Sequence, residues 1–321
     1  EDPNWGCHCF DKTRFADAKG MVDEVHALNA RIMISVWPKF YPTTDNYKEL
    51  DKIGGIYRRM VEQRPGESKD PKYISKMYRD WVGPGYANAF YDPYNPKAQD
   101  IYWRQIRENL GDMGFDAWWL DADEPDFHSN LSIEERAYRM SPTAKGPGAA
   151  LFNSFPLVHS EGVYQRQLIS KPNVRPFILS RSGFGGIQRA GTAVWSGDVA
   201  SRWDDLRDQI SAGVNLSMSG IPNWTHDIGG FALEDRYTKQ DPAHIDEWRE
   251  LNLRWFQFGA FTPLFRSHGE APKREIYEIA PAGSPMYSSM EWYLKLRYRL
   301  MPYIYTLAGD TWQKDGTIMR G

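Results

Sequence analysis

The chain has 321 residues, of which 41% are hydrophobic and 25% are charged, and its formal net charge is −3. This size can bury one large core, and the small net charge excludes a broad positive field that would attract nucleic acid. No apolar run approaches the about 18 residues that span a bilayer, so we expect no membrane span.

The only two cysteines, Cys7 and Cys9, stand near the start of the chain. For residues two apart on an extended segment we do not expect a mutual disulfide. Zinc ligand pairs usually stand two to four residues apart and need a second pair, which this sequence lacks. We therefore expect no metal site here.

Apolar residues at helical spacing repeatedly precede short β-rich runs. Met21, Val25 and Leu28 predict a helix that leads into a strand over 32–37. Further helices are predicted over about 102–113, 148–168, 203–212, 245–258 and 292–304, and further strands over about 115–120, 176–180, 193–195, 221–224 and 262–265. This alternation predicts a parallel sheet, and about six such units favour a (β/α)8 TIM-type barrel over an open sheet.

One stretch interrupts this alternation. Residues 57–84 are rich in Lys, Arg, Gly and Pro and show no clear period. Long connections of this kind usually lie outside the regular helices and strands of a domain. We interpret 57–84 as an excursion from the barrel, and a lid is one role open to it.

Polar and aromatic residues follow the predicted strands. In a barrel of parallel strands, the carboxyl ends of the strands carry the chemistry. Those positions hold Trp37, Asp121, Arg181, Asp198, Asp227 and His268. Hydrolysis of a glycosidic bond needs two carboxyl groups, and Asp121 and Asp198 are candidates beside tryptophans. The alternative role for a single Asp at the end of a strand is structural: its side chain would cap the following helix or turn.

The segment Trp119–Pro125 resembles the nucleophile motif of glycoside hydrolase family 31, in which Asp directly follows an aromatic and an aliphatic residue. Arg181–Arg189 and Trp195–Asp198, followed by Trp203 and Asp204, are similar to the second block of that family. Later similarities are Gly220–Pro222, Asp227–Phe231 and Arg266–His268. The blocks stand in the family's order.

The resemblance implies a retaining α-glycosidase that uses neither a metal nor an organic cofactor. Position by position, Asp121 would be the nucleophile and Asp198 the general acid/base. Sugar hydroxyls would be bound by Arg181, Asp227 and His268, and the pocket walls would be Trp37, Trp119, Trp195 and Phe231. Asp123 and Glu124 compete with Asp121 on composition alone, and the family's register favours Asp121.

Three phrases look most like the bacterial α-xylosidase branch: Ile34–Lys39, Trp81–Gly85 and Ala117–Asp121. We therefore expect release of α-linked xylose from xyloglucan oligosaccharides. An α-glucosidase or α-glucan transglycosylase is the near alternative, and a catalytically inactive carbohydrate-binding protein is the remote one. Trp37 could fill the space that the hydroxymethyl group of glucose would occupy.

Family members carry a β-sandwich and two barrel strands before the matching segment, and a β domain after it. We therefore expect 1–316 to be a partial catalytic (β/α)8 barrel that lacks its first strands, and 317–321 to begin a truncated C-terminal β domain. Whether the isolated fragment is active without the missing strands stays open. The oligomeric state and the compartment stay open, and a periplasmic or extracellular location in a bacterium would suit the full-length parent.

Overall fold

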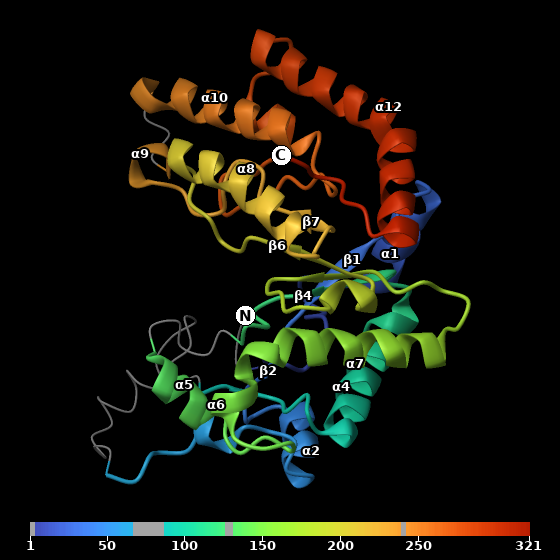
Figure 1. Ribbon diagram of the computed structural model, residues 1–321, viewed down its shortest axis with the longest axis vertical. Helices are drawn as coiled ribbons and strands as arrows, with labels where there is room; N and C mark the ends of the chain where they lie inside the picture. Colours follow the sequence, from blue (N-terminus) through green and yellow to red (C-terminus); the bar gives the residue numbers. More distant parts are fainter. Residues whose placement is uncertain (1–3, 67–86, 126–130, 239–241) are drawn as a thin grey trace. The chain divides into compact units, whose positions relative to one another are not determined.

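The computed structural model describes residues 4–66, 87–125, 131–238 and 242–321 (Figure 1). The chain divides into two compact units, Glu1–Thr192 and Ala193–Gly321, which are described separately. In the described ranges, no helix is both long and apolar enough to cross a membrane.

The first unit is built on three parallel strands, β1 (Met33–Val36), β4 (Ala117–Leu120) and β5 (Ile178–Ser180). Strand β4 lies in the middle, so that Trp119 is in register with Ser35 on one side and Leu179 on the other. Strands β2 (Lys39–Phe40) and β3 (Ala89–Phe90) form a separate antiparallel pair. The predicted strands over 32–37, 115–120 and 176–180 are thus present, with slightly shorter bounds.

The helices of the first unit include the predicted ones. They are α1 (Ala18–Ala27), α2 (Asp45–Lys52), α4 (Pro96–Asn109), α5 (Ile133–Arg139), α6 (Gly148–Leu151) and α7 (Phe155–Ser170), with short 3-10 helices at Arg58–Met60, Gly111–Met113, Phe152–Ser154 and Ile187–Ala190. Helix α4 begins where the side chain of Asn95 accepts hydrogen bonds from two backbone N–H groups, and Pro96 takes the first position, where no N–H is needed.

Helices α4 and α7 lie side by side against the strands (Figure 1). Trp118 of β4 is buried and donates its Nε1 hydrogen to Gln167 of α7, 2.8 Å away. Side chains alternate along a strand, so Trp119 and Asp121 point to the face opposite the helices. This alternation places the predicted nucleophile on the face of β4 that faces away from α7.

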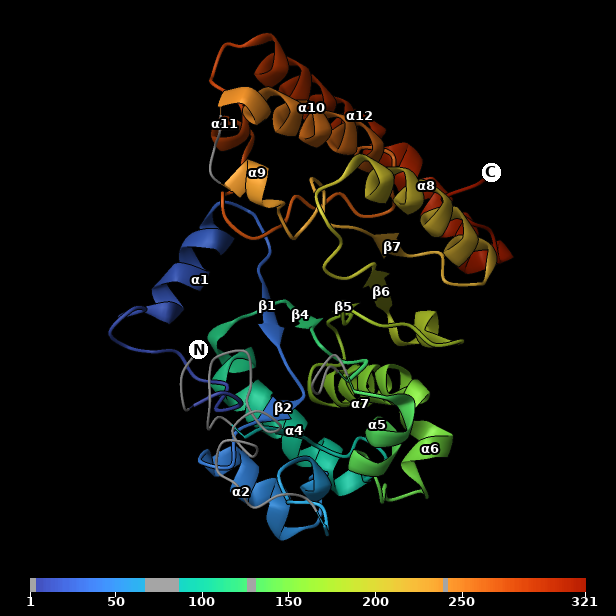
Figure 2. The same cartoon turned by 90° about the vertical axis from the view of Figure 1, so that its left-hand side faces the viewer.

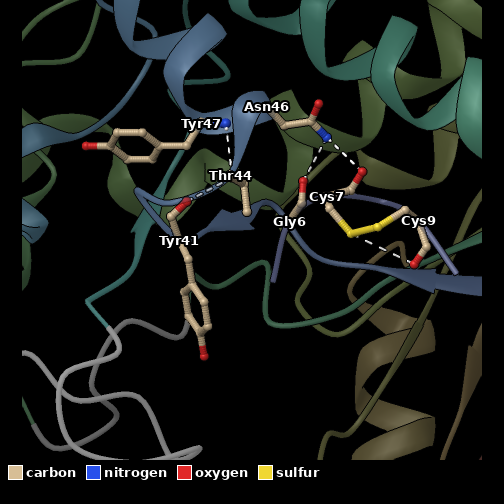
Figure 3. Close-up of a disulfide and its surroundings, with 7 residues drawn as sticks. All are labelled: Gly6, Cys7, Cys9, Tyr41, Thr44, Asn46 and Tyr47. Atoms are coloured by element: carbon tan, nitrogen blue, oxygen red, sulfur yellow. Dashed lines mark hydrogen bonds between the residues drawn. A yellow bond between two sulfur atoms is a disulfide. The ribbon is translucent and has the colours of Figure 1, made fainter. Parts of the chain in front are cut away.

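Cys7 and Cys9 form a disulfide (Figure 3), so the expectation that they would not bond to each other was wrong. On an extended strand, the Cα atoms of residues two positions apart are about 6.6 Å from each other, which is near the upper limit of the Cα–Cα distance in a disulfide. His8 instead has a left-handed backbone with φ of 51°, and the turn leaves the two Cα atoms 5.3 Å apart. The side-chain amide of Asn46 fixes this turn by donating to the carbonyl oxygens of Gly6 and Cys7.

The second unit combines two parallel strands with long helices. Strands β6 (Thr192–Trp195) and β7 (Trp224–Thr225) pair in register, and the helices are α8 (Trp203–Met218), α9 (Asp235–Thr238), α10 (Pro242–Gly259), α11 (Ile276–Ile279) and α12 (Pro285–Lys314). Helix α10 lies beside α8 and α12 (Figure 2). The core between them is formed by Leu206, Trp248, Trp255, Phe256 and Met290. The apolar face of α10 thus holds this unit together.

Three predicted elements differ from the structure, and the first is the strand predicted over 221–224, which is present only as β7 at Trp224–Thr225. The predicted strand over 262–265 is absent, and only isolated contacts such as the bridge between Ile228 and Ser267 join that segment to its neighbours. Pro263 has no N–H to donate to a ladder, which accounts for part of this difference. The predicted helix over 148–168 is divided into α6, a 3-10 turn and α7, where Pro156 occupies the first turn of α7.

The described start of the predicted excursion, residues 57–66, contains the 3-10 helix Arg58–Met60. The rest of it up to residue 84 and the whole segment Trp81–Gly85 lie outside the described residues. The proposed boundaries of the catalytic domain therefore stay predictions.

Candidate active site

Asp121 directly follows β4, as the sequence predicts. Its backbone N–H donates to the carbonyl of Val36 on β1, and its Oδ1 accepts from the N–H of Ala122 at 2.8 Å. Its side chain is 17% exposed, so the carboxylate is accessible while held in place. Ala122 has a left-handed backbone with φ of 57°, a strained conformation for a residue with a Cβ that is frequent at functional sites.

Arg181 follows β5 and is directed at the acidic cluster after β4. Its Nη1 lies 3.4 Å from Oδ1 of Asp121, and its Nε donates to Oε1 of Glu124 at 2.8 Å. A third carboxyl, that of Asp123, is fully buried and contacts Ser180 and Ser182, the residues on either side of Arg181. One guanidinium thus serves two carboxylates, one of them the predicted nucleophile.

Trp37 follows β1 and lies in a small cluster of rings and cations. Its ring meets that of Trp5 edge to face with centroids 4.9 Å apart, and the ammonium of Lys39 lies over both rings. The guanidinium of Arg181 lies 5.8 Å from the Trp37 ring centroid. Trp37 is therefore fixed on one side by Trp5 and Lys39 and approaches Arg181 on another.

In the second unit, Asp198 lies three residues after the end of β6 and is exposed. The N–H of Val199 donates to the carbonyl of Gly197, which places Asp198 at the apex of a three-residue turn. The carbonyl of Val199 in turn accepts from the N–H groups of Phe231 and Ala232. These contacts tie the loop that carries Asp198 to the loop that follows β7.

Asp227 is fully buried and forms an ion pair with Arg266. The guanidinium of Arg266 also lies 5.4 Å from the ring centroid of Trp195, the last residue of β6. This arrangement gives the predicted hydroxyl-binding carboxylate a fixed orientation.

His268 and Phe231 lie against each other with ring centroids 5.6 Å apart. Burial, together with the nearby charges of Arg266 and Arg274, lowers the pKa of His268 to about 4. Its imidazole is therefore neutral near pH 7 and can both donate to and accept from a sugar hydroxyl. Arg274 fixes the loop that carries Phe231, because its guanidinium donates to the carbonyl of Gly230 at 2.9 Å.

The structure thus gathers the predicted residues into two groups. Trp37, Trp119, Asp121 and Arg181 belong to the first unit, and Trp195, Asp198, Asp227, Phe231 and His268 to the second. In the described residues, no three acidic, His or Cys side chains gather as a metal site.

Sequence reasoning missed three contributors: Trp5, Lys39 and Arg266. Arg266 stands in the same Arg-Ser-His run as His268, so that run already held the signal for it. Nothing in the local pattern indicates the contact between Trp5 and Trp37, because 32 positions of chain separate them.

The family model for the TIM-barrel domain of glycosyl hydrolases family 31 matches residues 2–307. The chain belongs to glycosyl hydrolase family 31. The predicted TIM-type (β/α)8 fold, with its mostly parallel strands and covering helices, is thereby confirmed.

Several known glycosidases are similar to this chain. The α-xylosidase of Saccharolobus solfataricus is 33% identical over 98% of the chain and 38% of its own length, and α-glucosidase 2 of Bacillus thermoamyloliquefaciens is 28% identical over 97% and 36%. The crystal structure of a family 31 α-xylosidase from Xanthomonas citri matches this chain with a TM-score of 0.93 and 60% sequence identity. The match covers 99% of this chain and 33% of the α-xylosidase chain. The chain thus spans about a third of the length of these relatives.

Proposed function

We propose that the protein containing this chain is a retaining α-glycosidase, and that it is an α-xylosidase acting on xyloglucan oligosaccharides. The observation that carries the proposal is the position of Asp121 at the end of β4, in the register of the family's nucleophile and beside Arg181. The similarity to α-xylosidases from Xanthomonas citri and Saccharolobus solfataricus supports the choice of xylose.

In the proposed mechanism, Asp121 attacks the anomeric carbon while Asp198 protonates the departing oxygen. Asp198 then removes a proton from the water that releases the sugar. Retaining enzymes hold these two carboxyl groups about 5 to 5.5 Å apart. The exposed position of Asp198 at the apex of its turn suits a group that must exchange protons with an incoming water.

The other predicted residues bind the sugar. Arg181, Asp227 and neutral His268 would hydrogen-bond the hydroxyls, and Trp37, Trp119, Trp195 and Phe231 would cover the apolar C–H faces of the ring. The ion pair of Asp227 with Arg266 and the contact of Phe231 with His268 support these roles, because they fix the side chains before the sugar arrives.

The first test is hydrolysis of 4-nitrophenyl α-xyloside by the protein that contains this chain. We expect Asp121→Ala to abolish turnover and Asp112→Ala, an exposed carboxylate on the 3-10 helix Gly111–Met113, to leave the rate unchanged. With Asp198→Ala, added azide should yield α-xylosyl azide, since azide needs no general base to attack the covalent intermediate. An Asp121→Ala variant with the normal rate would remove Asp121 from its role.

The near alternative to an α-xylosidase is an α-glucosidase or α-glucan transglycosylase. The similarity to α-glucosidase 2 of Bacillus thermoamyloliquefaciens supports this alternative. Rates on xyloside, glucoside and maltose, together with a search for longer products, separate the three activities. An inactive carbohydrate-binding protein would bind sugars but turn over none of them. The presence of both Asp121 and Asp198 argues against that alternative.

A further inference from the structure

The proposed mechanism does not use Asp123, which is among the buried acids of the described residues. Asp123 has no exposed surface, and its carboxyl contacts the residues that flank Arg181. Its Oδ2 lies 2.6 Å from the hydroxyl oxygen of Ser180, and its Oδ1 accepts from the backbone N–H of Ser182 at 3.1 Å. The same Ser180 hydroxyl lies 2.7 Å from the carbonyl oxygen of Ser182.

These three short contacts constrain the hydrogens. A serine hydroxyl has one hydrogen to donate, and the Ser182 carbonyl has none. If Asp123 were a carboxylate, Ser180 could donate to Asp123 or to Ser182 but not to both, and one close oxygen pair would lack a hydrogen. If Asp123 is protonated, it donates to Ser180, Ser180 donates to the Ser182 carbonyl, and Ser182 N–H donates back to Asp123. The ring is then closed with every contact satisfied.

The surroundings favour the protonated form. Burial, reinforced by the negative charges of Glu124 and Asp121, raises the pKa of Asp123 well above its usual range. Among the described residues, Tyr91, next to β3, and Tyr102 on α4 also interact with it, and burial raises the pKa of both phenols. The guanidinium of Arg181 is engaged by Glu124 and Asp121.

We propose that Asp123 is an uncharged positioning residue: through the hydrogen-bond ring with Ser180 and Ser182 it fixes the backbone on both sides of Arg181, and so holds that guanidinium against Asp121. This role rests on the proposed function, in which Arg181 binds the sugar. Because Asp123 carries no charge, it does not compete with Asp121 and Glu124 for the positive charge of Arg181. Asp121 therefore keeps its contact with the guanidinium.

The chain offers a matched pair of substitutions. Asparagine keeps one N–H donor and one carbonyl acceptor at the two positions that the ring needs, whereas alanine removes both. We expect Asp123→Ala to raise KM for 4-nitrophenyl α-xyloside about tenfold with a smaller change in kcat, and Asp123→Asn to restore KM to within about twofold of the wild type. Because Ser180→Ala breaks the same ring, the double variant Asp123→Ala/Ser180→Ala should have the KM of Asp123→Ala alone.

Three results of these assays would overturn the proposal. Equal damage by Asn and Ala would show that a charged carboxylate is required, and a normal KM in Asp123→Ala would show that the ring does not position Arg181. A third possibility, that Asp123→Asn loses all turnover like Asp121→Ala, would make Asp123 the nucleophile.

A second measurement needs no activity. Infrared spectroscopy at pH 7 should show the C=O stretch of a protonated carboxyl in the wild-type protein, and this band should be missing from Asp123→Asn. Circular dichroism confirms that the variant is folded. A wild-type minus variant spectrum with carboxylate bands alone would overturn the inference. If the wild type cleaves no glycoside, the proposed function fails while this measurement still decides the protonation state of Asp123.

Discussion

Gly230 joins the two loops that carry the predicted residues of the second unit, and its replacement by alanine gives a sharp test of this packing. Gly230 has φ of 76°, and a Cβ there would lie 2.6 Å from both the N and the Cα of Ser201. Ser201 is bound to this loop by a hydrogen bond from its hydroxyl to the carbonyl of Gly229 at 2.6 Å. The backbone of Ser201 therefore cannot move away without breaking that contact.

Two costs add in Gly230→Ala. A left-handed backbone costs a residue with a Cβ about 1–2 kcal/mol. Forcing a methyl group into a packed backbone costs about 1–3 kcal/mol more. We expect the free energy of unfolding to fall by about 2–5 kcal/mol in total.

Gly220 provides the control. It has φ of 87°, yet a Cβ there would meet no atom within 4 Å. Gly220→Ala should therefore show only the backbone cost of about 1–2 kcal/mol. The free energies are measured by urea unfolding followed by circular dichroism and tryptophan fluorescence, whose transitions must coincide. Equal losses in the two variants would refute the argument that Ser201 blocks the site.

Three further predictions concern pH, the disulfide and the tryptophan cluster. Burial lowers the pKa of His226 to about 3, so the unfolded chain binds the proton first, and this histidine alone should lower stability by up to about 1.4 kcal/mol per pH unit between pH 6.5 and 3. His226→Asn, which keeps an acceptor for Trp255 Nε1, should flatten that slope in urea unfolding at pH 7, 6 and 5, and an unchanged slope would contradict the assignment. Replacing both cysteines by serine opens a loop of three residues and should lower the unfolding free energy by about 1.6 kcal/mol, and a loss of twice that would refute the loop-entropy reasoning. Trp5→Ala should raise KM for the xyloside about tenfold by releasing Trp37, while Trp312→Ala, at an exposed position on α12, should not change KM.

The sequence alone predicted most of the alternation of helices and strands, but not the absence of a strand over 262–265. The stripes that predict α1, α4 and α10 and the runs that predict β1, β4 and β6 are local signals, because the period of apolar residues reflects which face of an element is buried. It also placed Asp121 and Arg181 directly after their strands, since a motif preserves the order of residues along the chain. The family resemblance then named their proposed roles.

The tertiary structure decided which distant side chains touch. Asp123 and Ser180 are 57 positions apart, and no local pattern indicates that they share a hydrogen. The same holds for Trp5 against Trp37 and for Arg266 against Asp227. The disulfide between Cys7 and Cys9 depended on a single left-handed residue, His8, that no periodicity reveals. Periodicity records burial, whereas a hydrogen bond or a ring contact depends on the distance between two atoms, which is set only when the elements pack against one another.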